Sequence, residues 1–284
     1  MIKTFGIPYM GSKTKIALDI LKILPSGNRF VDLFGGGFAM SHAALLIKKY
    51  NHVLYNDINP RVTNLVKKAI NGDFNYNVFK PTFISRTDFF QNKDSDGYIK
   101  YVWSFGSDGK TYAFSKDLEP FRKACHNLVV FDEHSPILDS KCPNIYKVVT
   151  SNSIHNRRLQ ADRFLGNKSR DFPQLSRLER LQNLQNLNHL SHILSISNID
   201  YKDYQFQDGD IVYCDPPYEN TNDYGLSFNS KNFYDWCISR PFKVFFSSYK
   251  ISDNRFNLIF AKQSLSSFAS QSNSSINFEC LYSN

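Results

Sequence analysis

Hydrophobic positions in the first part of the chain follow two alternating periods. Apolar side chains recur at helical spacing over residues 14–24, and this run stops at a proline, as at the end of a helix. Residues 28–34 form a short apolar run before three glycines, and helical spacing resumes over residues 38–50. A second strand-like run at 52–59 precedes an amphipathic segment at 61–70. This alternation predicts an α/β fold with a parallel, doubly wound sheet.

The pattern changes over residues 76–191, where apolar groups are shorter and turn residues are more frequent. Two aromatic-rich arms flank a Gly-Ser-Asp-Gly turn within residues 98–114, which predicts a β-hairpin. Leucines then recur at every third residue from Leu175 to Leu190. An α-helix advances about 100° per residue, so this step drifts around its surface. The leucine segment is either one helix buried on several sides or two helices broken near residues 183–188.

The first pattern returns at residue 192. Strand-like runs are present at residues 192–201, 208–218, 242–249 and 276–284, with a helical run at 233–239. We therefore expect one sheet domain formed by residues 1–75 and 192–284. Residues 76–191 are predicted to be an inserted, mainly helical domain that contains the hairpin.

Composition and charge narrow the class of protein. The 284 residues include 42% hydrophobic side chains, which is typical of a folded globular protein. The formal net charge of +8 favours a polyanionic partner, although charge alone is weak evidence. The five cysteines are widely spaced without a CxxC pair, which argues against a zinc module or a disulfide framework. With no apolar run long enough for a bilayer and no signal-like start, we expect a cytoplasmic protein without metal or membrane partners.

A triple-glycine turn follows the first predicted strand. Asp32 and Phe34 lie at the end of this strand, directly before the turn that contains Gly35 and Gly37. Because glycines have no side chain, the backbone of such a turn can approach a ligand closely. It lacks the spacing of a dinucleotide or phosphate-loop motif, and it also fits a tight turn without a ligand. Asp57, at the end of the next predicted strand, can accept hydrogen bonds from ribose hydroxyls or cap a helix. Together these residues favour a cofactor that carries adenosine but no phosphate.

An Asp-Pro-Pro-Tyr sequence follows a later predicted strand, at the edge where open α/β sheets bind ligands. The carboxylate of Asp215 and the carbonyl of Pro216 can each accept a hydrogen from the exocyclic amino group of a planar base. Pro216 and Pro217 fix the backbone, and Tyr218 offers a ring on which a base can stack. We expect Asp215, Pro216, Pro217 and Tyr218 to form the catalytic centre.

These motifs resemble the DNA adenine methyltransferases typified by the bacterial GATC-methylating enzymes and their phage relatives. The resemblance covers nearly the whole chain, although Leu33 stands where many relatives carry proline. It implies a Rossmann-like methyltransferase sheet, S-adenosylmethionine as cofactor, double-stranded DNA as partner, and direct methyl transfer to adenine N6 after base flipping. The cofactor-binding residues that it implies are Tyr9, Lys13, Asp32, Phe34, Gly35, Gly37, Asp57, Asp200 and Tyr201.

The inserted region resembles the family's target-recognition segment, and it includes Trp-Ser-Phe-Gly at residues 103–106. Residues 76–191 hold 17 Lys or Arg and 12 Asp or Glu, so 17 − 12 = +5 of the total +8 lies there. A polar stretch of this region concentrates cations that can reach phosphates and guanine edges, or form a solvated surface. The candidate DNA-binding residues are Arg157, Arg158, Arg163, Lys168 and Arg170.

Other functions remain open at this point. Related motifs serve RNA adenine and cytosine N4, although cytosine enzymes more often begin the motif with serine. A protein-glutamine methyltransferase would usually carry Asn at position 215. A non-catalytic DNA-binding relative would be expected to have a damaged motif, and both motifs are intact. The recognised bases, the oligomeric state and a restriction endonuclease partner do not follow from the sequence.

Overall fold

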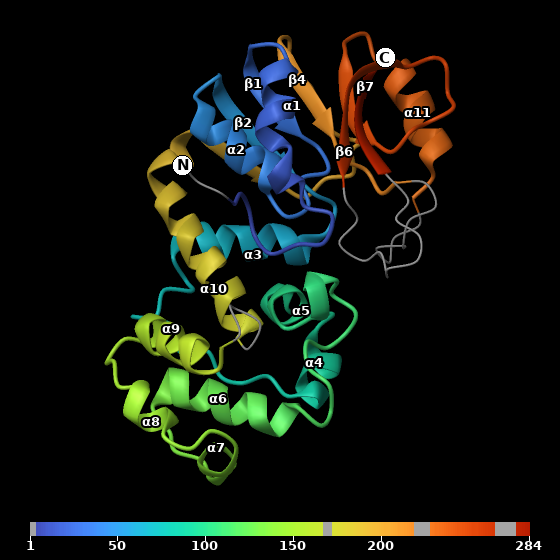
Figure 1. Cartoon of the computed structure of the whole chain (residues 1–284). Coiled ribbons are helices and arrows are strands. Elements are labelled where there is room, and N and C mark those ends of the chain that lie inside the picture. The colour runs from blue at the N-terminus through green and yellow to red at the C-terminus, as the bar shows by residue number, and fades with distance from the viewer. Residues whose placement is uncertain (1–3, 167–171, 219–227, 265–276) are drawn as a thin grey trace. The chain divides into compact units, whose positions relative to one another are not determined.

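The computed structural model describes residues 4–166, 172–218, 228–264 and 277–284. The chain forms two compact units (Figure 1). The first unit contains Met1–Phe5, Lys13–Thr63 and Leu190–Asn284, and the second contains Gly6–Ser12 and Asn64–His189.

A seven-stranded sheet forms the centre of the first unit in the described part of the chain. Its strands, in chain order, are β1 Gly27–Asp32, β2 Tyr50–Asn56, β3 Leu194–Ser197, β4 Asp210–Cys214, β5 Val244–Ser248, β6 Asn257–Ser264 and β7 Asn277–Ser283. The spatial order is β3-β2-β1-β4-β5-β7-β6. The first five strands in this order are parallel, whereas β7 is antiparallel to both β5 and β6. The predicted doubly wound α/β sheet is confirmed.

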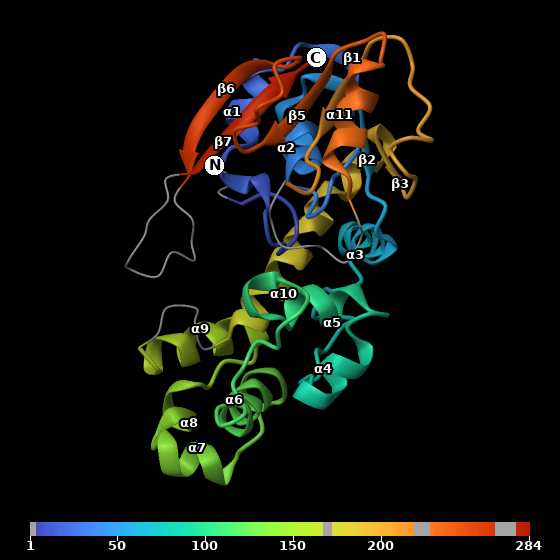
Figure 2. The ribbon, with the colours of Figure 1, turned by 90° about the vertical axis from the view of Figure 1, so that its right-hand side faces the viewer.

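Side chains alternate between the two faces of the sheet, as the period of a strand requires. On one face, Val31 and Val212 share a core with Phe233 of helix α11 (Ser230–Ile238). On the other face, the ring of Tyr55 contacts Phe38, the residue before helix α2 (Ala39–Ile47). The first unit also contains α1 (Ala17–Ile23) and the short 3₁₀ helix η1 (Lys13–Lys15). Helix α3 (Pro60–Asn71) begins in the first unit and ends in the second (Figure 2).

The apolar pattern of the sequence does not predict strand β6. This strand lies at the edge of the sheet, hydrogen-bonded to β7 alone among the described strands. It has no buried face, since Leu258, Ile259 and Lys262 are all exposed. An edge strand without a buried face lacks the apolar alternation by which strands are recognised.

The strand order reverses at β1, which pairs in parallel with β2 on one side and β4 on the other. Open α/β sheets bind ligands outside the carboxyl ends of the strands at such a switch point. Asp32 ends β1, and Asp215 directly follows β4. The topology therefore places both of these carboxylates at the same edge of the sheet.

A buried asparagine hydrogen-bonds to residues at the ends of β1 and β3 from the end of β2. Asn56 Nδ2 donates to the carbonyls of Leu33 and Ile199, both at 2.9 Å. Its Oδ1 accepts from the Ser197 hydroxyl at 2.7 Å and from the Ile199 N–H at 2.9 Å. Both the NH₂ group and the oxygen of the Asn56 side-chain amide are hydrogen-bonded. Asn56 therefore fixes the segments that follow β1 and β3 against the end of β2.

The second unit is built mainly of helices. They are α4 Arg86–Asn92, α5 Gly97–Val102, α6 Glu119–Phe131, α7 Pro136–Lys141, α8 Ile145–Val148, α9 Ile154–Phe164 and α10 Pro173–Asn183, with 3₁₀ turns η2 Phe105–Ser107 and η3 Leu184–Ile193. Leu128, Leu138 and Phe172 belong to its core.

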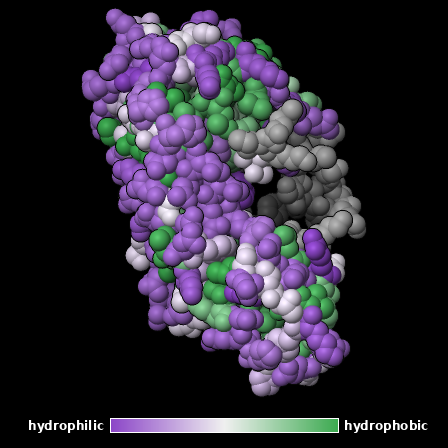
Figure 3. Space-filling view, turned by 90° about the vertical axis from the view of Figure 1, so that its left-hand side faces the viewer, coloured by the Kyte–Doolittle hydropathy of each residue, from purple (hydrophilic) through white to green (hydrophobic). Residues whose placement is uncertain are grey.

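Hydrophilic residues cover most of the face of the chain seen in Figure 3, and apolar residues show in smaller patches between them.

The predicted hairpin at residues 98–114 is wrong in its first arm, which is helix α5. The Asp96 carboxylate accepts from the N–H groups of Tyr98 and Ile99 and so caps this helix. Only a short antiparallel bridge between Ser104 and Tyr112 remains of the expected pairing. The local N-cap therefore outweighs the strand preference of the aromatic residues.

The leucine repeat is explained by a change of helix type. Helix α10 ends at Asn183, and the 3₁₀ helix η3 continues from Leu184, so the alternative with two helical segments is confirmed. A 3₁₀ helix has three residues per turn, so side chains three apart lie on the same side. Leu184 and Leu187 are accordingly both buried.

Two of the arginines proposed for DNA are buried in the second unit. Arg157 donates to the carbonyls of Val129 and Ser151 at 2.7 and 3.0 Å. Arg158 pairs with Glu179 at 2.8 Å and with Asp162 at 2.6 Å, and its side chain is only 8% exposed. These guanidinium groups link α9 to its neighbours within the unit.

Arg158→Ala should lower the free energy of unfolding by about 3 to 5 kcal/mol, because it leaves two largely buried carboxylates without their cation. Arg163→Ala is the matched control, because Arg163 is exposed on the same helix, and its effect should stay within about 0.5 kcal/mol. Chemical denaturation of both variants measures the difference. Equal stability of the two variants would contradict the structural role of Arg158.

Candidate active site

The Asp-Pro-Pro-Tyr sequence begins directly after β4. Asp215 Oδ1 lies 2.9 Å from Lys13 Nζ, and the Lys13 side chain is 7% exposed. Lys13 Nζ also lies 3.8 Å from Glu279 Oε2, on β7. Pro216, which follows Asp215, is buried. The lysine thus lies between two carboxylates from different parts of the chain.

Tyr218 joins the same group of residues. Its hydroxyl donates to Glu279 Oε2 at 2.8 Å, and Lys13 Nζ lies 4.8 Å from its ring centroid. The ring of Tyr249 meets it edge-on, at 4.7 Å between centroids and 76° between planes. We call Lys13, Asp215, Tyr218, Tyr249 and Glu279 the DPPY cluster. It combines a carboxylate acceptor with an aromatic ring whose position is fixed by contacts with Glu279, Lys13 and Tyr249.

The negative charges of the DPPY cluster favour a neutral or cationic ligand. Burial raises the pKa of Asp215 to about 6, Lys13 lowers this pKa, and the negative charge of Glu279 raises it. Asp215 is therefore mainly ionised at neutral pH and can accept hydrogen bonds. A second anion placed beside Asp215 and Glu279 would be repelled.

Asp32 lies at the end of β1 and is 1% exposed. Its Oδ2 accepts from the N–H and the hydroxyl of Ser41 at 3.2 and 2.7 Å. Its Oδ1 is buried without a hydrogen-bond partner among the described residues. Burial raises the pKa of Asp32 to about 7, and the charges of Asp215 and Asp57 act in the same direction. Such an orphaned acceptor is suited to a ligand that carries a donor.

The triple-glycine turn packs tightly against β2. The N–H of Gly35 donates to the Asn56 carbonyl at 2.8 Å, and a Cβ at Gly35 would lie 2.2 Å from the Tyr55 ring. The carbonyl of Gly36 accepts a hydrogen bond from the Tyr55 hydroxyl at 2.7 Å, and the backbone φ of Gly36 is 43°. Gly37 is buried in the same turn. Glycine at position 35 is therefore required by packing, whether or not a ligand is present.

Asp57 connects the turn to the chain after β2. Its Oδ2 accepts from Gly36 N–H, and its Oδ1 accepts from Asn59 N–H, each at 2.8 Å. Burial raises its pKa, and the two backbone hydrogen bonds lower it. The bond to Asn59 lies before helix α3, whose Arg61 N–H is instead bonded by Asn59 Oδ1 at 3.1 Å, so Asp57 does not cap this helix itself. The contact of Asp57 with ribose stays a prediction.

Aromatic rings gather beside the segments after β1 and β3. Phe34 lies 5.1 Å from Tyr201 and 5.6 Å edge-on to Phe233. Tyr201 is 9% exposed and also contacts Trp236 at 5.1 Å. The adjacent Asp200 accepts from a backbone N–H two residues further on. The structure thus brings Phe34 and Tyr201 together, and the half-buried Asp200 precedes Tyr201 directly in the chain.

The remaining predicted site residues lie in the second unit. Tyr9 packs against Tyr101 at 5.0 Å between centroids. Arg163 is exposed, whereas the guanidinium groups of Arg157 and Arg158 bind acceptors within the unit, so their contact with DNA stays a prediction. Lys168 and Arg170 are outside the described residues.

Sequence reasoning missed Glu279, Ser41 and Asn56. Glu279 is a lone charge within the apolar strand Asn-Phe-Glu-Cys-Leu-Tyr, which is the one local signal that marks it. Ser41 and Asn56 are polar positions in otherwise apolar segments, and their partners are distant in sequence.

Two further properties concern the described residues alone. No group of three or more His, Cys, Asp or Glu side chains there is arranged to hold a metal ion. No helix in those ranges has the length and apolar character needed to cross a membrane.

A known protein family matches most of the chain. The family model of the D12 class N6 adenine-specific DNA methyltransferase matches residues 9–240, which is more than half of the chain. No curated protein matches the sequence. The matched range includes Lys13, Asp32 and the Asp-Pro-Pro-Tyr sequence, and it ends before Glu279. The chain therefore belongs to the D12 class N6 adenine-specific DNA methyltransferase family.

Proposed function

We propose that the protein transfers a methyl group from S-adenosylmethionine to the N6 amino group of adenine in double-stranded DNA. The observation that carries this proposal is the DPPY cluster at the switch point of the sheet, where Asp215 and Tyr218 lie at the end of β4. The family match supports adenine in DNA as the substrate. The donor, the flipped base and the duplex are parts of the proposal.

The residues at the switch point fit a cationic cofactor. Asp32 ends β1, Asp57 and Asp215 directly follow β2 and β4 at the same edge, and Lys13 is paired with Asp215. The buried Asp32 Oδ1 lacks a donor among the described residues, and its raised pKa reflects burial beside other carboxylates. A ligand with an ammonium group would supply both a donor and a compensating charge.

Individual residues would hold separate parts of this cofactor. Asp32 would bind the ammonium end, Asp57 the ribose hydroxyls, and the rings of Phe34 and Tyr201 the adenine. When bound, S-adenosylmethionine supplies an electrophilic methyl group on a positively charged sulfur. Acidic surroundings such as those of Asp215 suit a ligand with this charge.

The chain's own groups would orient the target nitrogen. The amino group of adenine is a poor nucleophile, because its lone pair is delocalised into the ring. Asp215 would accept one N–H and the carbonyl of Pro216 the other, and both acceptors would stabilise the positive charge that develops on nitrogen. None of the five cysteines, all buried, is needed for this direct transfer.

A base within a duplex is out of reach of Asp215, so the adenine must leave the stack. The Tyr218 ring provides a surface for the displaced base, and its contacts with Tyr249 and Glu279 hold it in place. Stacking on a ring that is already oriented reduces the ordering cost of binding.

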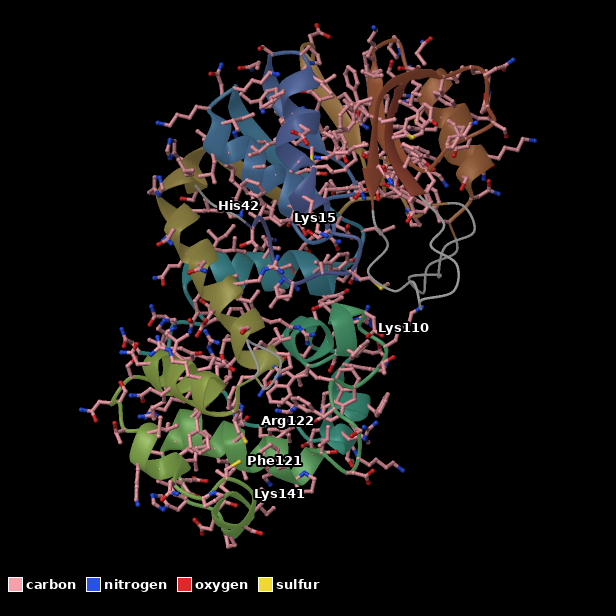
Figure 4. All side chains as sticks on the ribbon, in the orientation of Figure 1. Lys15, His42, Lys110, Phe121, Arg122 and Lys141 are labelled. Carbon is pink, nitrogen blue, oxygen red and sulfur yellow. The ribbon has the colours of Figure 1, made fainter. Side chains whose placement is uncertain are left out.

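We further propose that the second unit contacts DNA through cations other than Arg157 and Arg158. Arg122 and the exposed Lys141 both lie over the ring of Phe121, at 5.7 and 5.6 Å (Figure 4). Two cations beside one aromatic ring of the second unit can form part of a phosphate-binding surface. Residues 76–191 also carry most of the net positive charge of the chain.

Asp215→Ala should slow single-turnover methyl transfer by at least about 10²-fold, the scale of removing a group that stabilises developing charge. Cofactor affinity measured by calorimetry should be affected much less than the rate. The control is Asp57→Ala, which should instead weaken cofactor binding by about 1.5 to 3 kcal/mol. Near-normal transfer by Asp215→Ala would refute its proposed role.

Cofactor binding should depend on pH through Asp32, whose pKa is about 7. The carboxyl is neutral below this pH and ionised above it, so affinity for the cationic cofactor should fall as pH drops through and below the pKa. The decrease should approach about tenfold per pH unit, since one unit equals about 1.4 kcal/mol. Calorimetry measures it, and Asp32→Asn should bind more weakly under alkaline conditions with a flatter profile. An equally steep profile in Asp32→Asn would exclude this carboxyl.

Lys141→Ala should weaken DNA binding uniformly across sequences and reduce the salt slope of the binding constant by about 1. Lys262→Ala is the control, because this exposed lysine of the first unit already pairs with Asp19 at 2.7 Å. Fluorescence anisotropy over a range of salt concentrations compares them. If both variants have the same slope, the phosphate contact lies elsewhere.

A further inference from the structure

We propose that Glu279 is a positioning residue of the active site, which holds the Tyr218 hydroxyl and offers Lys13 a second carboxylate, so that Asp215 can exchange the lysine for the target amino group. The inference rests on the proposed function of the DPPY cluster. Glu279 lies on β7, outside the range that the family model matches.

The direction of the Glu279 side chain is the first support. Lys262 of β6 is directly opposite Glu279 in the strand register, but its ammonium pairs with Asp19. The Glu279 carboxylate is 17% exposed and contacts Tyr218 and Lys13 instead. A carboxylate so far removed from water needs partners of this kind. Glu279 is therefore part of the DPPY cluster, although it comes from a distant strand.

The bond to Tyr218 is the second support. Its ring is held edge-on to Tyr249, and the hydroxyl bond of 2.8 Å to Glu279 fixes its far end. Without this bond the ring loses one of the contacts that orient it. A ring already oriented for stacking pays less conformational entropy when a base arrives. Glu279 would thus act on the base through Tyr218.

Competition for Asp215 is the third support. Asp215 Oδ1 contacts Lys13 Nζ, and under the proposed function the same carboxylate also accepts an N–H of the target base, which weakens its hold on the lysine. A buried ammonium that loses its partner is costly unless another carboxylate replaces it. Glu279 Oε2 is already 3.8 Å from Lys13 Nζ. A small displacement of the lysine side chain would therefore move its ion pair from Asp215 to Glu279. The charge of Glu279 therefore matters as well as its hydrogen bond.

Glutamine at position 279 separates these two effects, because it keeps a hydrogen-bond acceptor and removes the charge. Among the described residues, the titratable groups that interact electrostatically with Asp215 are Lys13 of η1, Glu279 of β7, Asp32 of β1, the Cys214 thiol and the phenols of Tyr213, Tyr218 and Tyr249. Among these, Glu279 raises the pKa of Asp215. Removing its charge should move the acid limb of the pH–rate profile to lower pH. Loss of packing alone would leave this limb in place.

The test is single-turnover transfer from radiolabelled S-adenosylmethionine to unmethylated genomic DNA, with the full chain. Glu279→Leu should be at least tenfold slower than wild type, with cofactor affinity within twofold of wild type. Glu279→Gln should lose less and show the shifted acid limb. Asp19→Asn, which removes a carboxylate paired with Lys262, is the control and should match wild type. Wild-type rates and an unshifted limb in both Glu279 variants would overturn the proposal.

A second measurement is independent of activity. Melting temperatures of Glu279→Leu, Tyr218→Phe and the double variant report whether the two side chains are coupled. We expect the double variant to melt no lower than the less stable single variant. Strictly additive losses would overturn the contact. If wild type itself transfers no methyl group to DNA, the proposed function fails, and this cycle still decides whether Glu279 holds Tyr218.

Discussion

Burial of several carboxylates at one sheet edge is the constraint on which the rest of the site depends. The reversal of strand order at β1 brings Asp32 and Asp215 to the same edge, where the charge of Asp215 raises the pKa of Asp32. Lys13 compensates only part of this charge, through its pair with Asp215. An arrangement of this kind is stable at neutral pH when further donors or cations approach the acids. This buried acidic edge therefore supports the proposal of a cationic cofactor and a donor-bearing base.

Rigid backbone around the carboxylates makes this arrangement persist. Asn56 uses all its amide groups to hold the segments after β1 and β3, and Gly35 allows the turn to lie against Tyr55. Asp57 bonds to Gly36 within the same turn. Acceptors fixed in advance stabilise developing charge without the cost of reorganisation. The polar network and the glycine turn thus serve the same end as the carboxylates that they orient.

Features that depend on local sequence can be predicted, and those that depend on distant partners cannot. The parallel strands and the motif from Asp215 to Tyr218 follow from apolar runs and adjacent residues, and the sheet is as expected. Glu279 and its bond to Tyr218 join residues 61 positions apart, which no local pattern records. The first arm of the predicted hairpin is an exception, because it is wrong although the cap at Asp96 is local, and there the strand preference of the aromatic residues misled the prediction. Arg158 resembles a surface cation in the sequence, because only packing brings Glu179 beside it.

The net charge of the chain is positive, whereas the charge at the switch point of the sheet is negative, and this difference affects which part of a substrate can enter the site. Residues 76–191 carry +5 of the net charge of +8, so the chain as a whole attracts a polyanion. The switch point has the opposite character, because Asp32, Asp215 and Glu279 outnumber Lys13 there. A phosphate is repelled from such a site, whereas an uncharged base with donor groups can enter it. Under the proposed function, the acidic edge would therefore admit the base and exclude the backbone that carries it, which is the discrimination that methylation of an exocyclic amine requires.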